Sequence, residues 1–136
     1  MEEYNLEKDI KIFYVTATSF PEGISAAHEK LQNLLPDIKD RHFYGVSRPE
    51  NNKGIIYKAG VEESYQGEGE TLGFDTLILK QGKYIGALIK DYTKDVSIVE
   101  KTFQKILKNP DLDPNGYCVE MYIGQKDLRC MVRLKD

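Results

Sequence analysis

One acidic residue lies at the centre of a stretch that otherwise has the composition of a buried strand. Residues 117–123 surround Glu120 with aromatic, β-branched and sulfur-containing neighbours. A carboxylate in such a strand must face water, pair with a cation or accept an altered pKa. Tyr122 lies two residues further on, so its side chain points to the same side of the strand as Glu120. An anion beside an aromatic ring on the open face of a sheet suits an organic cation or a proton transfer. The alternative is an exposed strand whose polar face meets solvent.

The composition is that of an ordinary globular domain. The chain has 136 residues, which predicts one domain over residues 1–136, and its 19 basic and 22 acidic residues give a net charge of −3. This balance argues against direct nucleic-acid binding. No apolar run approaches the roughly 20 residues of a membrane span, so we expect no membrane association and a cytoplasmic protein. His28 and His42 have no clustered cysteines, so we expect neither a metal nor another cofactor.

Two cysteines flank a predicted hairpin turn at residues 124–127. If the turn centres on residues 125 and 126, Cys118 lies opposite Arg133 and Cys130 lies opposite Met121. The two thiols would then face opposite sides of the hairpin and could not form a disulfide. Reduced thiols are also what a cytoplasmic location favours.

The other patterns predict an α+β chain with a repeated order of elements. Apolar residues at helical spacing predict helices over residues 23–35 and 96–108, each followed by a proline. Strand-like segments are residues 11–18, 42–47, 54–61, 75–79, 83–90, 117–123 and 128–134, with a turn at 48–53. Strand, helix, strand, strand therefore occurs twice. Such a duplicated unit predicts an antiparallel sheet with two helices on one face and a ligand cleft on the other.

An acidic stretch joins the two halves. Residues 62–70 carry four glutamates and two glycines, but they lack the third glycine and the βαβ setting of a dinucleotide site. We predict a solvated connection here, or a mobile flap over the cleft.

Four short motifs occur in an order that is typical of one family. They are Tyr44-Gly45-Val46, Tyr57-Lys58-Ala59-Gly60-Val61, Gln81-Gly82-Lys83-Tyr84 and Glu120-Met121-Tyr122. Over residues 9–134 the chain resembles the GyrI-like small-molecule-binding domain. That domain is the effector-binding module of many bacterial multidrug-responsive transcription activators of the AraC and MerR types. The resemblance implies a twofold-repeated α+β fold with a central cleft, in which the matching glutamate neutralises cationic, aromatic ligands.

The resemblance assigns roles to five residues. Glu120 is the expected anionic anchor and Tyr122 a wall of the ligand site, while Tyr84 matches the Gly-x-Tyr of the family. Tyr44 and Tyr57 match strand positions that approach the cleft. A shift of one residue in either strand would turn the side chain to the other face of the sheet, so the face is left open. For each tyrosine the alternative is packing in the core.

Three functions follow from these expectations. With only residues 1–10 ahead of the first predicted strand, where many relatives carry a helix-turn-helix, we expect a stand-alone binding module that does not itself activate transcription. It would sense or sequester small cationic, aromatic molecules and have a regulator protein as partner. A small-molecule hydrolase that uses Glu120 and a tyrosine is one alternative. A protein inhibitor of the DNA gyrase inhibitor type is another.

Overall fold

The protein is an antiparallel α+β structure, described by a computed structural model over residues 1–50 and 52–136. Its described residues form two compact units. Unit 1 comprises Met1–Asp9 and Lys80–Asp136, and unit 2 comprises Ile10–Leu79. Asn51, within the predicted turn at 48–53, lies outside the described residues. In the described ranges, none of the helices has both the length and the apolar character needed to cross a bilayer. The prediction of one domain stays a prediction.

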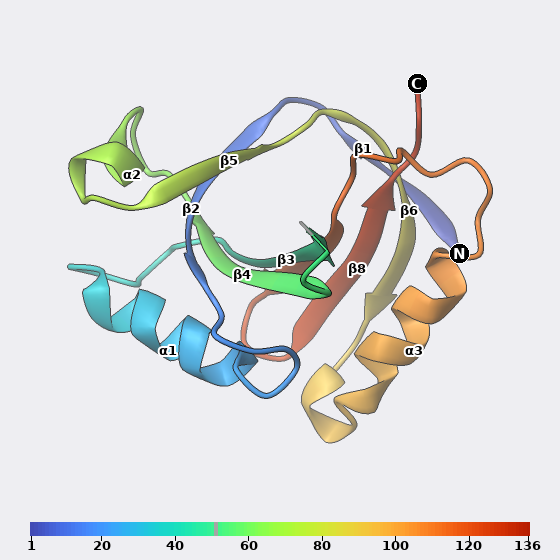
Figure 1. Cartoon of the computed structure of the whole chain (residues 1–136), viewed down its shortest axis with the longest axis horizontal. Helices are drawn as coiled ribbons and strands as arrows, with labels where there is room; N and C mark the ends of the chain where they lie inside the picture. Colours follow the sequence, from blue (N-terminus) through green and yellow to red (C-terminus); the bar gives the residue numbers. More distant parts are fainter. Residues whose placement is uncertain (51) are drawn as a thin grey trace. The chain divides into compact units, whose positions relative to one another are not determined.

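Unit 2 is built on four antiparallel strands. Its elements are β2 (Ile10–Thr16), α1 (Ile24–Leu34), β3 (Phe43–Pro49), β4 (Ile55–Glu62), α2 (Glu68–Thr71) and β5 (Asp75–Leu79). The strand order is β3-β4-β2-β5. The helix α1 lies along this sheet (Figure 1).

The packing of α1 explains why this segment is helical. Ala27, Leu31 and Leu35 recur at four-residue spacing and are buried, so they form one apolar stripe. The stripe packs on side chains of β2 and β4, including Phe13 and Val61. The helix ends before Pro36 as predicted.

Unit 1 has the same kind of sheet. Its elements are β1 (Glu2–Leu6), β6 (Gly82–Ile89), the 3-10 helix η1 (Tyr92–Lys94), α3 (Ser97–Ile106), β7 (Cys118–Ile123) and β8 (Asp127–Arg133). The strand order is β1-β6-β8-β7, with antiparallel pairing throughout. In Figure 1, α3 lies beside β6 and β8.

The start of α3 is fixed by an aspartate. Asp95 accepts hydrogen bonds from the backbone N–H of Ser97 at 3.1 Å and from its hydroxyl at 2.6 Å, which satisfies one of the exposed donors of the first turn. Val99, Phe103 and Ile106 then face the sheet of unit 1. The second predicted helix is therefore confirmed, with the aspartate as its N-terminal partner.

The order of elements is the same in the two units. Unit 2 contains β2-α1-β3-β4, and unit 1 contains β6-α3-β7-β8 with η1 ahead of the helix. In each unit the third strand of this series pairs with both of the others. Each unit also has one further strand, β5 beside β2 and β1 beside β6.

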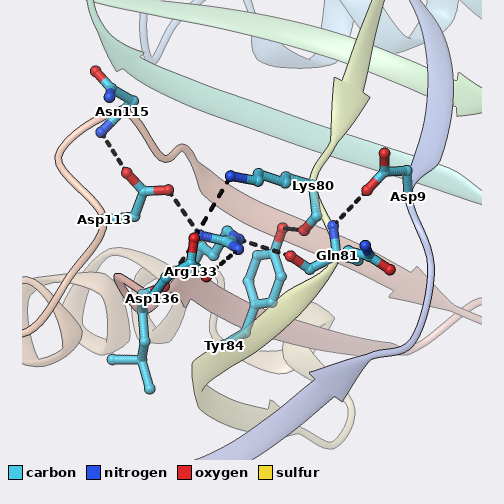
Figure 2. A network of polar contacts seen from close by, with 9 residues as sticks. Asp9, Lys80, Gln81, Tyr84, Asp113, Asn115, Arg133 and Asp136 are labelled. Carbon is cyan, nitrogen blue, oxygen red and sulfur yellow. Dashed lines mark hydrogen bonds and ion pairs between the residues drawn. The ribbon is translucent and has the colours of Figure 1, made fainter.

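A polar network surrounds Arg133 in unit 1 (Figure 2). The guanidinium donates from Nε to the carbonyl oxygen of Gln81 at 2.9 Å, from Nη1 to Asp113 at 3.1 Å and from Nη2 to Asp136 at 2.8 Å. Because Arg133 is 5% exposed, these acceptors satisfy a charge that would otherwise be costly to bury.

The acidic stretch at residues 62–70 is folded against unit 2, so the prediction of a solvated connection or flap is wrong. Glu68 is 3% exposed and makes two hydrogen bonds to Arg41, at 2.8 and 2.6 Å. Glu63 accepts the backbone N–H groups of Gly67 and Gly69. A Cβ at Gly69 would lie 2.7 Å from the Cβ of Phe13. The absence of a side chain there lets the stretch approach the sheet closely.

Candidate functional site

Glu120 and Tyr122 form a hydrogen-bonded pair on β7. The Tyr122 hydroxyl donates to Glu120 Oε1 at 2.7 Å, an ordinary length for an O–H···O hydrogen bond. Glu120 is only 9% exposed. The prediction that the two side chains share one side of the strand is confirmed, and the alternative of an exposed strand is wrong at this residue.

The pair lies on the sheet face that carries α3. Glu120 is opposite Cys130 in the β7–β8 register, and Cys130 belongs to the apolar cluster that includes Ile106 of α3. Tyr122 packs against the same cluster. The prediction that placed Glu120 on the open face is therefore wrong. Its neighbour Val119 points to the other face and is only 1% exposed, so both faces of β7 are covered. The alternation of polar and apolar residues along β7 therefore does not distinguish the face under α3 from the opposite face.

The two cysteines lie on this same face, and the predicted register of the hairpin is wrong by one residue. Cys118 is opposite Val132, and Glu120 is opposite Cys130. The turn has three residues, 124–126, with Gly124 at a φ of 61°, whereas the prediction assumed an even number. A shift of one residue moves each side chain to the other face. Both cysteines are free thiols.

Tyr92 is a further aromatic residue at the pair, and none of the sequence motifs selected it. It lies in η1, between β6 and α3, and its ring meets that of Tyr122 edge-on, with centroids 5.9 Å apart and planes inclined by 61°. This is a favoured arrangement for two aromatic rings. A signal that would have pointed to it is an aromatic residue in the short connection from a strand to a helix that covers the same sheet face.

The charge of Glu120 affects the groups around it. Burial, and then the Glu120 charge, raise the pKa of Cys118 to about 11 and that of Cys130 to about 12. The same two causes raise the pKa of Tyr92. These groups are therefore neutral near pH 7, and neither thiol is poised as a nucleophile. The site combines a buried carboxylate with two phenol rings and two protonated thiols.

Tyr84 is not part of this group. It is opposite Arg133 in the β6–β8 register, and Arg133 alternates with Val132, so Tyr84 points to the face away from α3. Its hydroxyl donates to the carbonyl oxygen of Lys80 at 2.7 Å (Figure 2). Burial raises its pKa to about 12. Tyr84 is a core residue within the network around Arg133.

Tyr57 and Tyr44 lie on opposite faces of the sheet of unit 2. Tyr57 is 1% exposed, faces α1, and its hydroxyl is 2.8 Å from Nε2 of His28. Burial lowers the pKa of His28 to about 4, so the imidazole is neutral at physiological pH. Tyr44 is opposite Gly60 in the β3–β4 register and therefore points the other way. The structure thus brings together Glu120 and Tyr122 but not Tyr44 and Tyr57.

Metal ligation has no support within the described residues. Among residues 1–50 and 52–136, no three His, Cys, Asp or Glu side chains are grouped so as to hold a metal ion. We call Glu120, Tyr122, Tyr92, Cys118 and Cys130 the Glu120 group. Its chemistry is that of an anion enclosed by aromatic rings.

Taken together, the described residues form an α+β protein with a buried carboxylate–tyrosine pair beneath a helix. Neither a family model nor a curated protein matches the sequence. The chain is similar to the crystal structure of integron cassette protein VCH_CASS2, from the mobile metagenome of Vibrio cholerae. The TM-score is 0.70 at 13% sequence identity, over 98% of this chain and 95% of that chain. At this identity the similarity concerns the fold alone.

Proposed function

We propose that the protein binds small cationic, aromatic molecules, with Glu120 as the anionic anchor and Tyr122 as an aromatic wall. The observation that carries this proposal is the buried carboxylate, 9% exposed, that accepts the Tyr122 hydroxyl at 2.7 Å on the face covered by α3. A buried charge of this kind is costly to retain for stability alone, because well-packed apolar side chains would serve as well.

The energy available at such a site is sufficient for useful affinity. At about 4 Å a carboxylate and a cation attract each other by roughly 4 kcal/mol at an intermediate dielectric, before desolvation is subtracted. Contact of the cation with tyrosine rings adds about 0.5–2 kcal/mol. Affinities on the order of 1 μM are therefore within reach.

The resemblance to GyrI-like effector-binding domains supports the same proposal. The order strand, helix, strand, strand in each unit is consistent with a duplicated unit. The proposed site keeps the Glu-x-Tyr motif of that family, although it lies on the sheet face that carries α3. We further propose a cytoplasmic role in sensing or sequestering such molecules, with a regulator protein as partner.

A pair of isosteric probes tests the role of the charge. Acridine, studied at a mildly alkaline pH where it is uncharged, and 10-methylacridinium, which is always a cation, share one ring system. We expect fluorescence titration to show that Glu120→Gln weakens binding of 10-methylacridinium at least several-fold and leaves acridine almost unaffected. An equal loss for both probes would show that the charge does not select the ligand.

The matched control is Glu100→Gln, which makes the same charge change on an exposed residue of α3. It should leave both titrations as in the wild type. A loss of 10-methylacridinium binding in the control as large as in Glu120→Gln would assign the effect to net charge rather than to the site. Failure of the wild type to bind either probe would direct attention to the protein-inhibitor hypothesis, which stays a prediction.

The short bond between the Tyr122 hydroxyl and Glu120 favours one second candidate, a small-molecule hydrolase. Glu120 would act as general base towards water and Tyr122 as proton donor. In that case Tyr122→Phe should lower turnover of an electrophilic substrate by about 10²–10⁴-fold with little change in affinity. In a binding protein the same variant keeps the ring and loses only modest affinity.

A further inference from the structure

Tyr92 contacts the Glu120 group from outside the sheet. Its half-buried ring meets the Tyr122 ring with centroids 5.9 Å apart, while Tyr122 donates its hydroxyl to Glu120. The two phenol planes are inclined by 61°, so they form two non-parallel surfaces next to one carboxylate. Neither the sequence motifs nor the family resemblance gives Tyr92 a role.

The backbone at Tyr92 is held by the hairpin that carries the site. The N–H of Tyr92 donates to the carbonyl oxygen of Lys126 at 2.9 Å, and the N–H of Asp91 donates to Asp127 Oδ1 at 3.0 Å. Asp91 itself has a φ of 51°, a left-handed conformation that is uncommon for a residue other than glycine. The two acceptor atoms that hold this bend therefore belong to Lys126 of the β7–β8 turn and to Asp127, the first residue of β8.

We propose that Tyr92 is the second aromatic wall of the cation site, that Asp127 positions it, and that the site consequently prefers planar aromatic cations. This inference rests on the proposed function and adds to it a specificity-determining residue and a positioning residue. Asp127 acts on ligand binding through the Asp91–Tyr92 backbone, since its carboxylate bonds to Asp91 N–H and to Lys90.

The preference for planar cations follows from the shape of aromatic contacts. A ring face attracts a cation through its quadrupole, and a flat cation offers a large area to that face as well as charge to the carboxylate. A compact alkylammonium keeps the charge but lacks the flat surface. Tyr92 should therefore contribute more to binding of 10-methylacridinium than to binding of tetraethylammonium.

Substitution of Tyr92 tests the wall directly. Tyr92→Leu should weaken 10-methylacridinium binding about 5- to 10-fold, which is the size expected for loss of a partly desolvated cation–π contact. The loss for tetraethylammonium, measured by competition, should be clearly smaller. Tyr92→Phe keeps the ring face and should bind like the wild type. Thermal unfolding of each variant verifies that the fold is intact.

The positioning role of Asp127 is tested by rescue and by a double-mutant cycle. Asp127→Ala should weaken 10-methylacridinium binding several-fold. Asp127→Asn keeps an acceptor for the Asp91 N–H and should retain most of the wild-type affinity. In the Tyr92→Leu background, Asp127→Ala should have almost no further effect, because its influence passes through the missing ring. Lys90→Gln removes only the exposed ion pair and is the matched control.

The outcomes separate this inference from the function on which it rests. If binding depends on Glu120 but Tyr92→Leu binds 10-methylacridinium as tightly as the wild type, the inference is overturned and the proposed function stands. Additive effects of Asp127→Ala and Tyr92→Leu overturn the positioning role. A wild type that binds no cationic probe, or binds it equally well after Glu120→Gln, overturns the proposed function and the inference with it.

Discussion

The protein buries two glutamates in very different surroundings. Glu68 of unit 2 is 3% exposed and meets Arg41 in a two-bonded ion pair, with further hydrogen bonds from the backbone N–H and the hydroxyl of Ser64. Glu120 of unit 1 is 9% exposed and accepts the hydroxyl of Tyr122 among thiols and a second phenol ring.

The difference shows that burial alone does not identify a functional carboxylate. Arg41 is the main cause that lowers the pKa of Glu68 to about 2, so this charge is committed to a cation of the fold. Burial, and secondly the Glu120 charge, raise the pKa values of Tyr92, Cys118 and Cys130. The ion pair with Arg41 marks Glu68 as a structural residue.

The largest effect that we expect comes from breaking the structural pair. Arg41→Ala leaves the Glu68 charge buried without its cation and should lower the free energy of unfolding by about 3–5 kcal/mol, measured by urea denaturation. Lys135→Ala, which removes the partner of the exposed Asp111, should cost far less. Equal losses would show that the ion pair at Glu68 is no more structural than a surface pair.

Acid should weaken the pair at Glu68 in a defined range. The pKa of Glu68 is about 2 in the folded chain, against an ordinary value of 4.5, so its stabilisation is complete above about 4.5 and is lost as the pH falls towards 2. The shift corresponds to about 3 kcal/mol. Between these pH values, urea denaturation should therefore show that the free energy of unfolding falls more steeply for the wild type than for Glu68→Gln. Parallel curves would contradict the assignment.

A smaller effect should distinguish the hydrogen bonds of two tyrosines. Tyr122→Phe removes a bond to a carboxylate and should cost about 1.5–3 kcal/mol of unfolding free energy, whereas Tyr84→Phe removes a bond to a backbone carbonyl and should cost about 0.5–1.5 kcal/mol. The two variants delete the same atom, from a half-buried ring at Tyr122 and a buried ring at Tyr84, so each is the control of the other. The reverse order would contradict the assignment of the stronger bond to Tyr122.

The smallest effect concerns thiol reactivity next to Glu120. The pKa of Cys118 is raised mainly by burial and secondly by the Glu120 charge, so Glu120→Gln should lower it while burial keeps it high. Alkylation of Cys118 by iodoacetamide, followed by mass spectrometry, should then become a few times faster at pH 8, because the thiolate fraction increases. Glu100→Gln should leave the rate unchanged. A slower reaction in Glu120→Gln would contradict the electrostatic assignment.

Periodic segments of the sequence predicted most elements of the fold, because their side chains are selected by one buried face. The helix at residues 23–35 and the strands at 54–61 and 117–123 are all present in the structure, with bounds that differ by a few residues. The strand β1 was not predicted, since Glu2, Glu3 and Asn5 have low strand propensity and the strand is fixed by pairing with β6. Tertiary pairing of this kind leaves no local pattern.

The candidate site was predicted in part. The spacing of Glu120 and Tyr122 sufficed to place them together, because strand alternation is a local property. Their sheet face was not predictable, since Val119 and Cys130 are buried on opposite faces. Tyr92 was missed because its position depends on a bend held by a distant turn. The predicted contributions of Tyr44 and Tyr57 to one site stay predictions.

The membership of β1 in unit 1 has a consequence for the order in which the chain can acquire structure during synthesis. Unit 2 is continuous from Ile10 to Leu79, so its strands β2, β3, β4 and β5 are available to one another once that segment has left the ribosome. The strand β1 precedes unit 2 but has its partner in β6, about 80 residues later along the chain. Unit 1 gains its last strand only with β8. Strand β1 must therefore wait, unpaired with its own sheet, while the four strands that follow it can already pair with one another.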